Sequence, residues 1–100
     1  TTSMTIGSGT AITKHLSGTG TNDFAAPAAV PGETATFNIT VTGAALGNTV
    51  VVSATITTPT NLLLVGYVSA ADICTVKWVQ VAGAAADPAN ATYRCDVWQH

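Results

Sequence analysis

TATFNITVT, residues 34–42, alternates strictly between apolar and polar side chains. Its apolar members are Ala35, Phe37, Ile39 and Val41, and every residue between them is Thr or Asn. A period of two is typical of a β-strand with one face in the core and the other in solvent. We therefore take this stretch as a strand, and the rest of the chain is interpreted outward from it.

Four further segments follow with the composition of strands, and turn sequences rich in Gly, Pro, Asn and Asp separate them. They are residues 49–57, 62–69, 73–81 and 91–98. No segment of ten or more residues shows a helical period. The sequence predicts an all-β domain, either an antiparallel β-sandwich or a jelly roll.

Two of these segments have an unusually high apolar content. Residues 49–57 are apolar on both sides, so we expect a central strand or one enclosed between two layers. In residues 62–69 the apolar side chains outnumber those that one buried face requires. The last two segments each place one cysteine on the face expected to point inward. These faces consist of Cys74, Val76 and Trp78 in the first and of Tyr93, Cys95 and Val97 in the second.

The length of 100 residues allows a single domain, within which the first part differs in composition. Residues 1–22 are rich in Thr, Ser and Gly. We expect them to form either edge strands, at residues 2–6 and 11–17, or an extended arm that becomes ordered on a partner. Residues 23–100 are expected to form the β-sandwich.

Charged residues are scarce, at 8% of the chain against about 25% in an average globular protein. The polar surface must come mainly from uncharged side chains, and Thr, with 18 residues, is the commonest. Such a surface costs little to remove from water, because the large penalty for burying ions is absent. We expect partners to cover much of it. A Thr-rich monomer is the alternative.

The charge balance also argues against several classes of partner. A net charge of −2 and only three cationic side chains, Lys14, Lys77 and Arg94, do not provide the basic patch that nucleic acid requires. The chain has no run of 18 apolar residues and no leader-like start. We expect a complete small protein, made in a cytoplasm, that contacts neither nucleic acid nor membrane.

The residues that usually carry catalysis do not form a recognisable constellation. The two histidines are His15, in the polar leader, and His100, the last residue. The carboxylates fall mostly where turns are expected, and they do not form a catalytic pair or a metal-ligand spacing. We expect no enzymatic activity, no cofactor and no metal site. The five acidic residues are Asp23, Glu33, Asp72, Asp87 and Asp96.

Two cysteines are too few for a disulfide framework. Cys74 and Cys95 are expected to be buried free thiols that behave as small hydrophobic residues. The alternative is a bridge between neighbouring strands, formed after release into an oxidising medium.

The candidate contact residues are aromatic or apolar. Trp98 faces away from Cys95 near the end of the chain and is expected at a subunit contact, where aromatic residues are enriched. Tyr67 is a second candidate, and Met4 and Ile6 are the apolar residues of a clamp-like leader. A carbohydrate-stacking role for Tyr67, Trp78 or Trp98 is a further alternative.

Over residues 40–98 the chain resembles a small virion module of tailed bacteriophages. The resemblance lies in VTGAALGNTVVV (41–52), GYVSAADICTVKWVQV (66–81) and DPANATYRCDVW (87–98), which recur in this order. Cys74 and Cys95 depart from the pattern, since Val usually fills both positions, and Trp78 replaces a smaller aliphatic residue.

The resemblance implies a β-sandwich protomer that assembles about a threefold axis in the virion. We expect a homotrimeric capsid cement (decoration) protein on the capsid surface, bound across junctions of the major capsid protein, with residues 1–22 as its clamp. The alternative is the distal domain of a head or tail fibre that binds a host receptor or a glycan.

Overall fold

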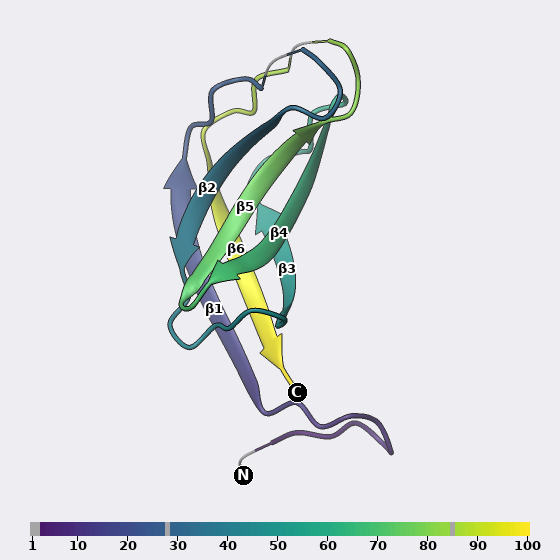
Figure 1. Ribbon diagram of the computed structural model, residues 1–100, viewed down its shortest axis with the longest axis vertical. Helices are drawn as coiled ribbons and strands as arrows, with labels where there is room; N and C mark the ends of the chain where they lie inside the picture. Colours follow the sequence, from purple (N-terminus) through teal and green to yellow (C-terminus); the bar gives the residue numbers. More distant parts are fainter. Residues whose placement is uncertain (1–2, 28, 85) are drawn as a thin grey trace.

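The computed structural model describes residues 3–27, 29–84 and 86–100. Thr1 and Thr2 of the expected leader, and Ala28 and Ala85 in two expected connections, lie outside the described residues. The described part contains six strands and no helix, which confirms the all-β prediction (Figure 1). Across the described residues there is accordingly no helix with the length and apolar character needed to cross a membrane. The strands are β1 (Lys14–Asn22), β2 (Thr34–Thr40), β3 (Thr49–Ala54), β4 (Leu62–Ala70), β5 (Ile73–Gln80) and β6 (Ala91–Gln99).

The strands form two antiparallel sheets of three strands each. One has the order β1-β6-β3 and the other β2-β5-β4, so that β6 and β5 are the central strands. The five segments expected from the sequence all contain a strand. Only β4 and β5 form a hairpin within one sheet, and each of the other connections passes from one sheet to the other (Figure 1).

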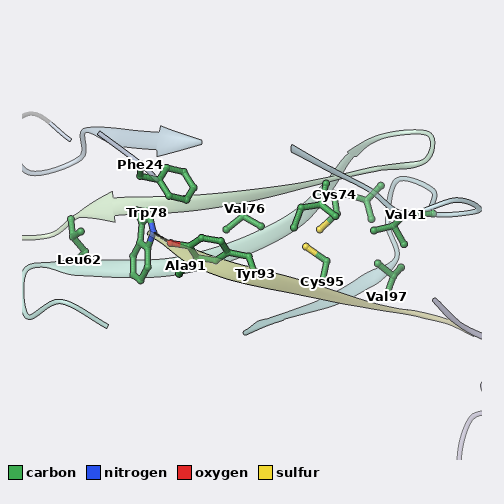
Figure 2. Packing of buried hydrophobic residues seen from close by; sticks show 13 residues of the cluster. Phe24, Val41, Leu62, Cys74, Val76, Trp78, Ala91, Tyr93, Cys95 and Val97 are labelled. Carbon is green, nitrogen blue, oxygen red and sulfur yellow. Dashed lines mark hydrogen bonds between the residues drawn. The ribbon is translucent and has the colours of Figure 1, made fainter. Parts of the chain in front are cut away.

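The hydrophobic core lies between the two sheets and is built mainly from the central strands (Figure 2). Alternate residues of β5 and β6 point inward, as the pleat of a strand requires. This confirms the inward faces expected from the sequence. Cys74, Val76 and Trp78 of β5 and Tyr93, Cys95 and Val97 of β6 are fully buried.

Strand β3 is an edge strand, and the expectation of a central or enclosed position for residues 49–57 was wrong. Val50 and Val52 face the core and are half-buried, whereas Val51 between them is exposed on the outer face. An apolar run does not by itself distinguish an enclosed strand from an edge strand that carries an apolar residue on its outer face. The central place in this sheet is taken by β6, whose residues alternate.

Glycines on two edge strands let the sheets approach closely. A Cβ atom at Gly66 of β4 would overlap Cγ2 of Val52 in β3. A Cβ atom at Gly18 of β1 would lie 2.6 Å from the carbonyl oxygen of Thr40. Any larger residue at either position would push the two sheets apart, because neither obstacle is the free end of a flexible side chain.

Strand β1 pairs with β6 along its whole length, from Lys14 opposite Gln99 to Asn22 opposite Ala91. The residues before it leave the sheet. We refer to residues 3–13 as the arm, and Figure 1 shows it projecting past the C-terminal end of β6. Its two halves are linked by backbone hydrogen bonds between Met4 and Ile12, of 2.8 and 2.6 Å.

Candidate functional site

The side chains that could carry chemistry are dispersed over the molecule. In the ranges that the structure describes, no three His, Cys, Asp or Glu side chains are grouped so that they could hold a metal ion. Asp72, with a positive φ of 65°, occupies the turn between β4 and β5. Its Oδ1 accepts a 2.8 Å hydrogen bond from the backbone N–H of Gly43, which ties this turn to the loop after β2.

His15 forms a cluster with Trp98 and Asp96 on the outer face of the β1-β6-β3 sheet. It lies opposite Trp98 in the pairing of β1 with β6, and the two rings stack with centroids 4.1 Å apart. Nε2 of His15 also lies 3.2 Å from Oδ1 of Asp96. The Trp98 ring is stacked on His15 at the end of the sheet from which the arm departs.

A groove of about 320 Å³ separates the arm from this cluster. The groove is open to solvent, and both its walls are partly apolar. The full lining consists of Ser3, Met4, Ile12, Thr13, Lys14, His15 and Trp98.

The arm itself presents apolar side chains to solvent. Met4 is 53% exposed and Ile6 is 75% exposed. Gly7 follows with a φ of +58°, and the N–H of Gly9 donates a 3.0 Å hydrogen bond to the carbonyl of Ile6. The turn at the tip is therefore ordered by its own backbone, and it displays Ile6 away from the body of the protein. Exposed apolar groups on a projecting segment are suited to insertion into a partner.

A second apolar surface lies on the outer face of the β2-β5-β4 sheet. Leu63 and Val65 of β4 lie directly opposite Val79 and Lys77 of β5, and paired residues share one face of a sheet. Because Trp78 points into the core, its neighbours Lys77 and Val79 must point outward. We define the β4–β5 strip by its apolar members. They are Leu63, Val65, Tyr67 and Val79, of which Leu63 and Tyr67 are exposed.

The β4–β5 strip carries almost no charge. Lys77 is the one charged residue in the sequences of β2, β4 and β5. Its Nζ lies 5.1 Å from the centroid of the Tyr67 ring, a distance at which a cation is attracted to the ring face. Covering this surface with another chain would therefore desolvate a single ion that already has a partner.

The outer face of the other sheet has a different character. Its side chains satisfy one another across the strands: Nη1 of Arg94 donates a 2.9 Å hydrogen bond to Oγ of Ser17. The hydroxyl groups of Thr21 and Thr92 lie 2.9 Å apart. This polar face is consistent with contact to water, and it makes the β4–β5 strip the more favourable of the two faces for burial.

The contact residues expected from the sequence fall on both surfaces. Met4 and Trp98 line the groove together, and Ile6 lies at the tip of the arm. Tyr67 belongs to the β4–β5 strip in the other sheet. Trp78 is fully buried, so its suggested role in stacking on a carbohydrate was wrong. No contact role was predicted for Leu63, Val65 and Val79, although the excess of apolar residues in 62–69 indicated that such a face exists.

The two cysteines face one another across the core as free thiols (Figure 2). Cys74 lies in β5 and Cys95 in β6, the central strands of opposite sheets, so the strands that the alternative of a bridge would join are not hydrogen-bonded neighbours. Burial raises the pKa of both thiols. Contact with the Cys74 thiol raises the pKa of Cys95 further. Both groups are therefore protonated and poorly nucleophilic while the core is closed.

No protein-family model, no curated protein and no solved structure matches the chain.

Proposed function

We propose that this protein is a structural component of a larger assembly: a homotrimeric cement protein that binds the expanded capsid of a tailed bacteriophage. The single observation that carries the proposal is the ordered arm with Met4 and Ile6 exposed beyond the body of the molecule. The resemblance of residues 40–98 to small phage virion modules supports the identity of the assembly.

The arm is the proposed contact with the major capsid protein. Inserting Met4 and Ile6 into a junction between capsid subunits removes apolar surface from water, at about 25 cal/mol for each Å². The groove beside Trp98 then accommodates a segment of the neighbouring capsid subunit. The arm is short, so each such contact is small, and the effect on the shell comes from many repeated copies.

The β4–β5 strip is the proposed contact between copies of this chain. A threefold ring needs a heterologous interface that closes after three subunits. The strip is apolar, and its one cation is paired with Tyr67. These properties favour another copy of the same low-charge chain over a strongly charged partner.

The jelly-roll variant of the sandwich also belongs to this proposal. A complete jelly roll has eight strands, and the described residues of this chain supply six. The two halves of the arm are already paired through the bridge between Met4 and Ile12, and they would add further strands when the arm docks on a neighbour.

The stabilising mechanism would be mass action. A protein that binds only the expanded shell lowers the free energy of that state by an amount set by its concentration relative to its dissociation constant. The protein needs no catalytic group for this role, only repeated complementary contacts.

Binding to purified expanded heads tests the proposal. We expect the wild-type chain to co-sediment with expanded heads at a fixed ratio and to raise the temperature at which they disrupt. The variant Met4→Ser/Ile6→Ser should lose at least tenfold in affinity while its circular dichroism is unchanged. Leu46→Ser is the matched control, because Leu46 is 71% exposed on the loop between β2 and β3 and does not belong to the arm, and it should bind normally.

Three outcomes would count against the proposal or a part of it. Wild-type protein that does not bind expanded heads contradicts the cement function. Binding to a host receptor or to glycans in place of heads supports the fibre-domain alternative. Equal loss of binding in the arm variant and in Leu46→Ser contradicts the role of the arm.

A further inference from the structure

Cys74 and Cys95 occupy corresponding positions in the two layers. Each lies on the central strand of its sheet, and each side chain is fully buried. The two sulfur atoms point toward one another in the core (Figure 2). No third cysteine exists in the chain that could compete for either of them.

The sheets come close together beside the cysteines. Packed sheets are generally about 10 Å apart, whereas a disulfide needs Cα atoms within about 7 Å. At their nearest points, Cα atoms of β5 and β6 approach to within 8 Å. Gly18 lies opposite Cys95 in the pairing of β1 with β6 and would collide with Thr40 of the other sheet if it had a Cβ.

A second glycine acts in the same way on the other side. Gly66 pairs with Val76, two residues from Cys74, and it makes room for Val52, which pairs with Cys95. The cysteines therefore lie between two points at which small residues draw the layers together. The close approach of the sheets at these glycines does not depend on how the thiols are oriented, so it supports a short distance between the cysteines independently of Figure 2.

We propose that Cys74 and Cys95 form an inter-sheet disulfide that covalently joins the two layers of the domain. The bond closes the chain from β5, through the connection after Gln80, to β6. It is independent of the proposed capsid function, since it concerns the interior of one chain.

The oxidation is a thiol–disulfide exchange with a low-molecular-weight disulfide such as oxidised glutathione. The thiolate of one cysteine attacks glutathione disulfide, which forms a mixed disulfide and releases one glutathione thiolate. The second cysteine then displaces the other glutathione as its thiolate. The two cysteines lose two electrons and two protons, and the two glutathione molecules gain them.

Burial determines when this exchange can occur. The attacking species is the thiolate, and a raised pKa together with a closed core suppresses it. The bond should form while the core is open, during folding or transient unfolding in an oxidising medium. Once formed, it should resist reduction in the native state for the same reason.

Refolding the full chain in oxidised and reduced glutathione tests the proposal. We expect a chain with no covalent link to another chain and a mass lower by two hydrogens, with no cysteine alkylated by iodoacetamide in denaturant. Digestion should give one cross-linked peptide that contains both Cys74 and Cys95. Two alkylated cysteines, or a bond between chains, would overturn the proposal.

Comparing the melting temperatures of the oxidised and the reduced protein distinguishes a disulfide from thiols that merely fail to react with iodoacetamide. The oxidised wild type should melt roughly 10–20 °C above the same protein kept in reductant. The variant Cys74→Val/Cys95→Val should fold, because valine has a similar size and Val76 and Val97 already lie nearby, and its Tm should not respond to reductant. If that variant fails to fold, the two redox forms of the wild type still provide the test. Equal melting temperatures of these two forms would contradict the proposal.

Discussion

Nε1 of Trp78 donates a 3.0 Å hydrogen bond to the hydroxyl oxygen of Tyr93, and the bond joins the central strands of the two sheets through the core. Both side chains are fully buried, and their rings meet edge to face with centroids 6.3 Å apart. Without this bond, the one polar group of the Trp78 side chain, its buried N–H, would have no hydrogen-bond acceptor. It also fixes how the two layers face one another.

Tyr93→Phe should destabilise the protein by about 1–3 kcal/mol, because it leaves the buried N–H of Trp78 without an acceptor. Urea unfolding followed by tryptophan fluorescence measures this change. Tyr67→Phe removes the same hydroxyl group from an exposed ring and should change stability by less than about 0.5 kcal/mol. Equal effects of the two substitutions would contradict a structural role for this hydrogen bond.

Gly66→Ala should destabilise the protein by about 1–3 kcal/mol, because the added methyl group overlaps Val52 on the facing strand. Thermal unfolding provides the measurement. Gly83→Ala is the control, since a Cβ there meets nothing within 4 Å, and it should be close to neutral. The double variant Gly66→Ala/Val52→Ala should lose less stability than the two single effects added together, because Val52→Ala removes the obstacle. Strict additivity would show that the sheets are not in contact at this point.

The reduced protein should lose stability as the pH rises above about 9. The pKa of each thiol is raised by burial from its ordinary value of 9.0. Above that pH the unfolded chain releases these protons while the folded chain retains them, so the free energy of unfolding falls by up to about 1.4 kcal/mol per pH unit for each thiol. Urea unfolding at pH 8 and pH 10, in the presence of reductant, measures the difference. In Cys74→Val/Cys95→Val this part of the pH dependence should be missing, and an unchanged slope would show that the thiols ionise equally in both states.

Much of the fold could be predicted because the strands of this chain alternate clearly. The inward residues of β5 and β6 follow directly from period two, as does the strand at Thr34–Thr40. The order of strands within the sheets could not be predicted, because it depends on contacts between segments far apart in the chain. The position of β3 illustrates this, since Val51 looks like a core residue in the sequence and faces outward in the structure.

The candidate contact surfaces were only partly predictable. Sequence reasoning found Met4, Ile6, Tyr67 and Trp98 as apolar or aromatic residues without an assigned core position. It could not group Trp98 with Met4, because the groove exists only where the arm returns past the end of β6. The facing arrangement of Cys74 and Cys95 depends likewise on two sheets whose separation the sequence pattern does not encode.

Light scattering of the purified chain, coupled to size-exclusion chromatography, tests most directly the claim that this low-charge surface is covered by other chains. The account predicts a mass close to three times the 10.0 kDa of one chain. Leu63→Glu, in the β4–β5 strip, should shift the protein to monomer, whereas Val51→Glu should leave the trimer intact; the two residues are similarly exposed, at 51% and 55%. A stable monomer for the wild type at all concentrations would contradict the account.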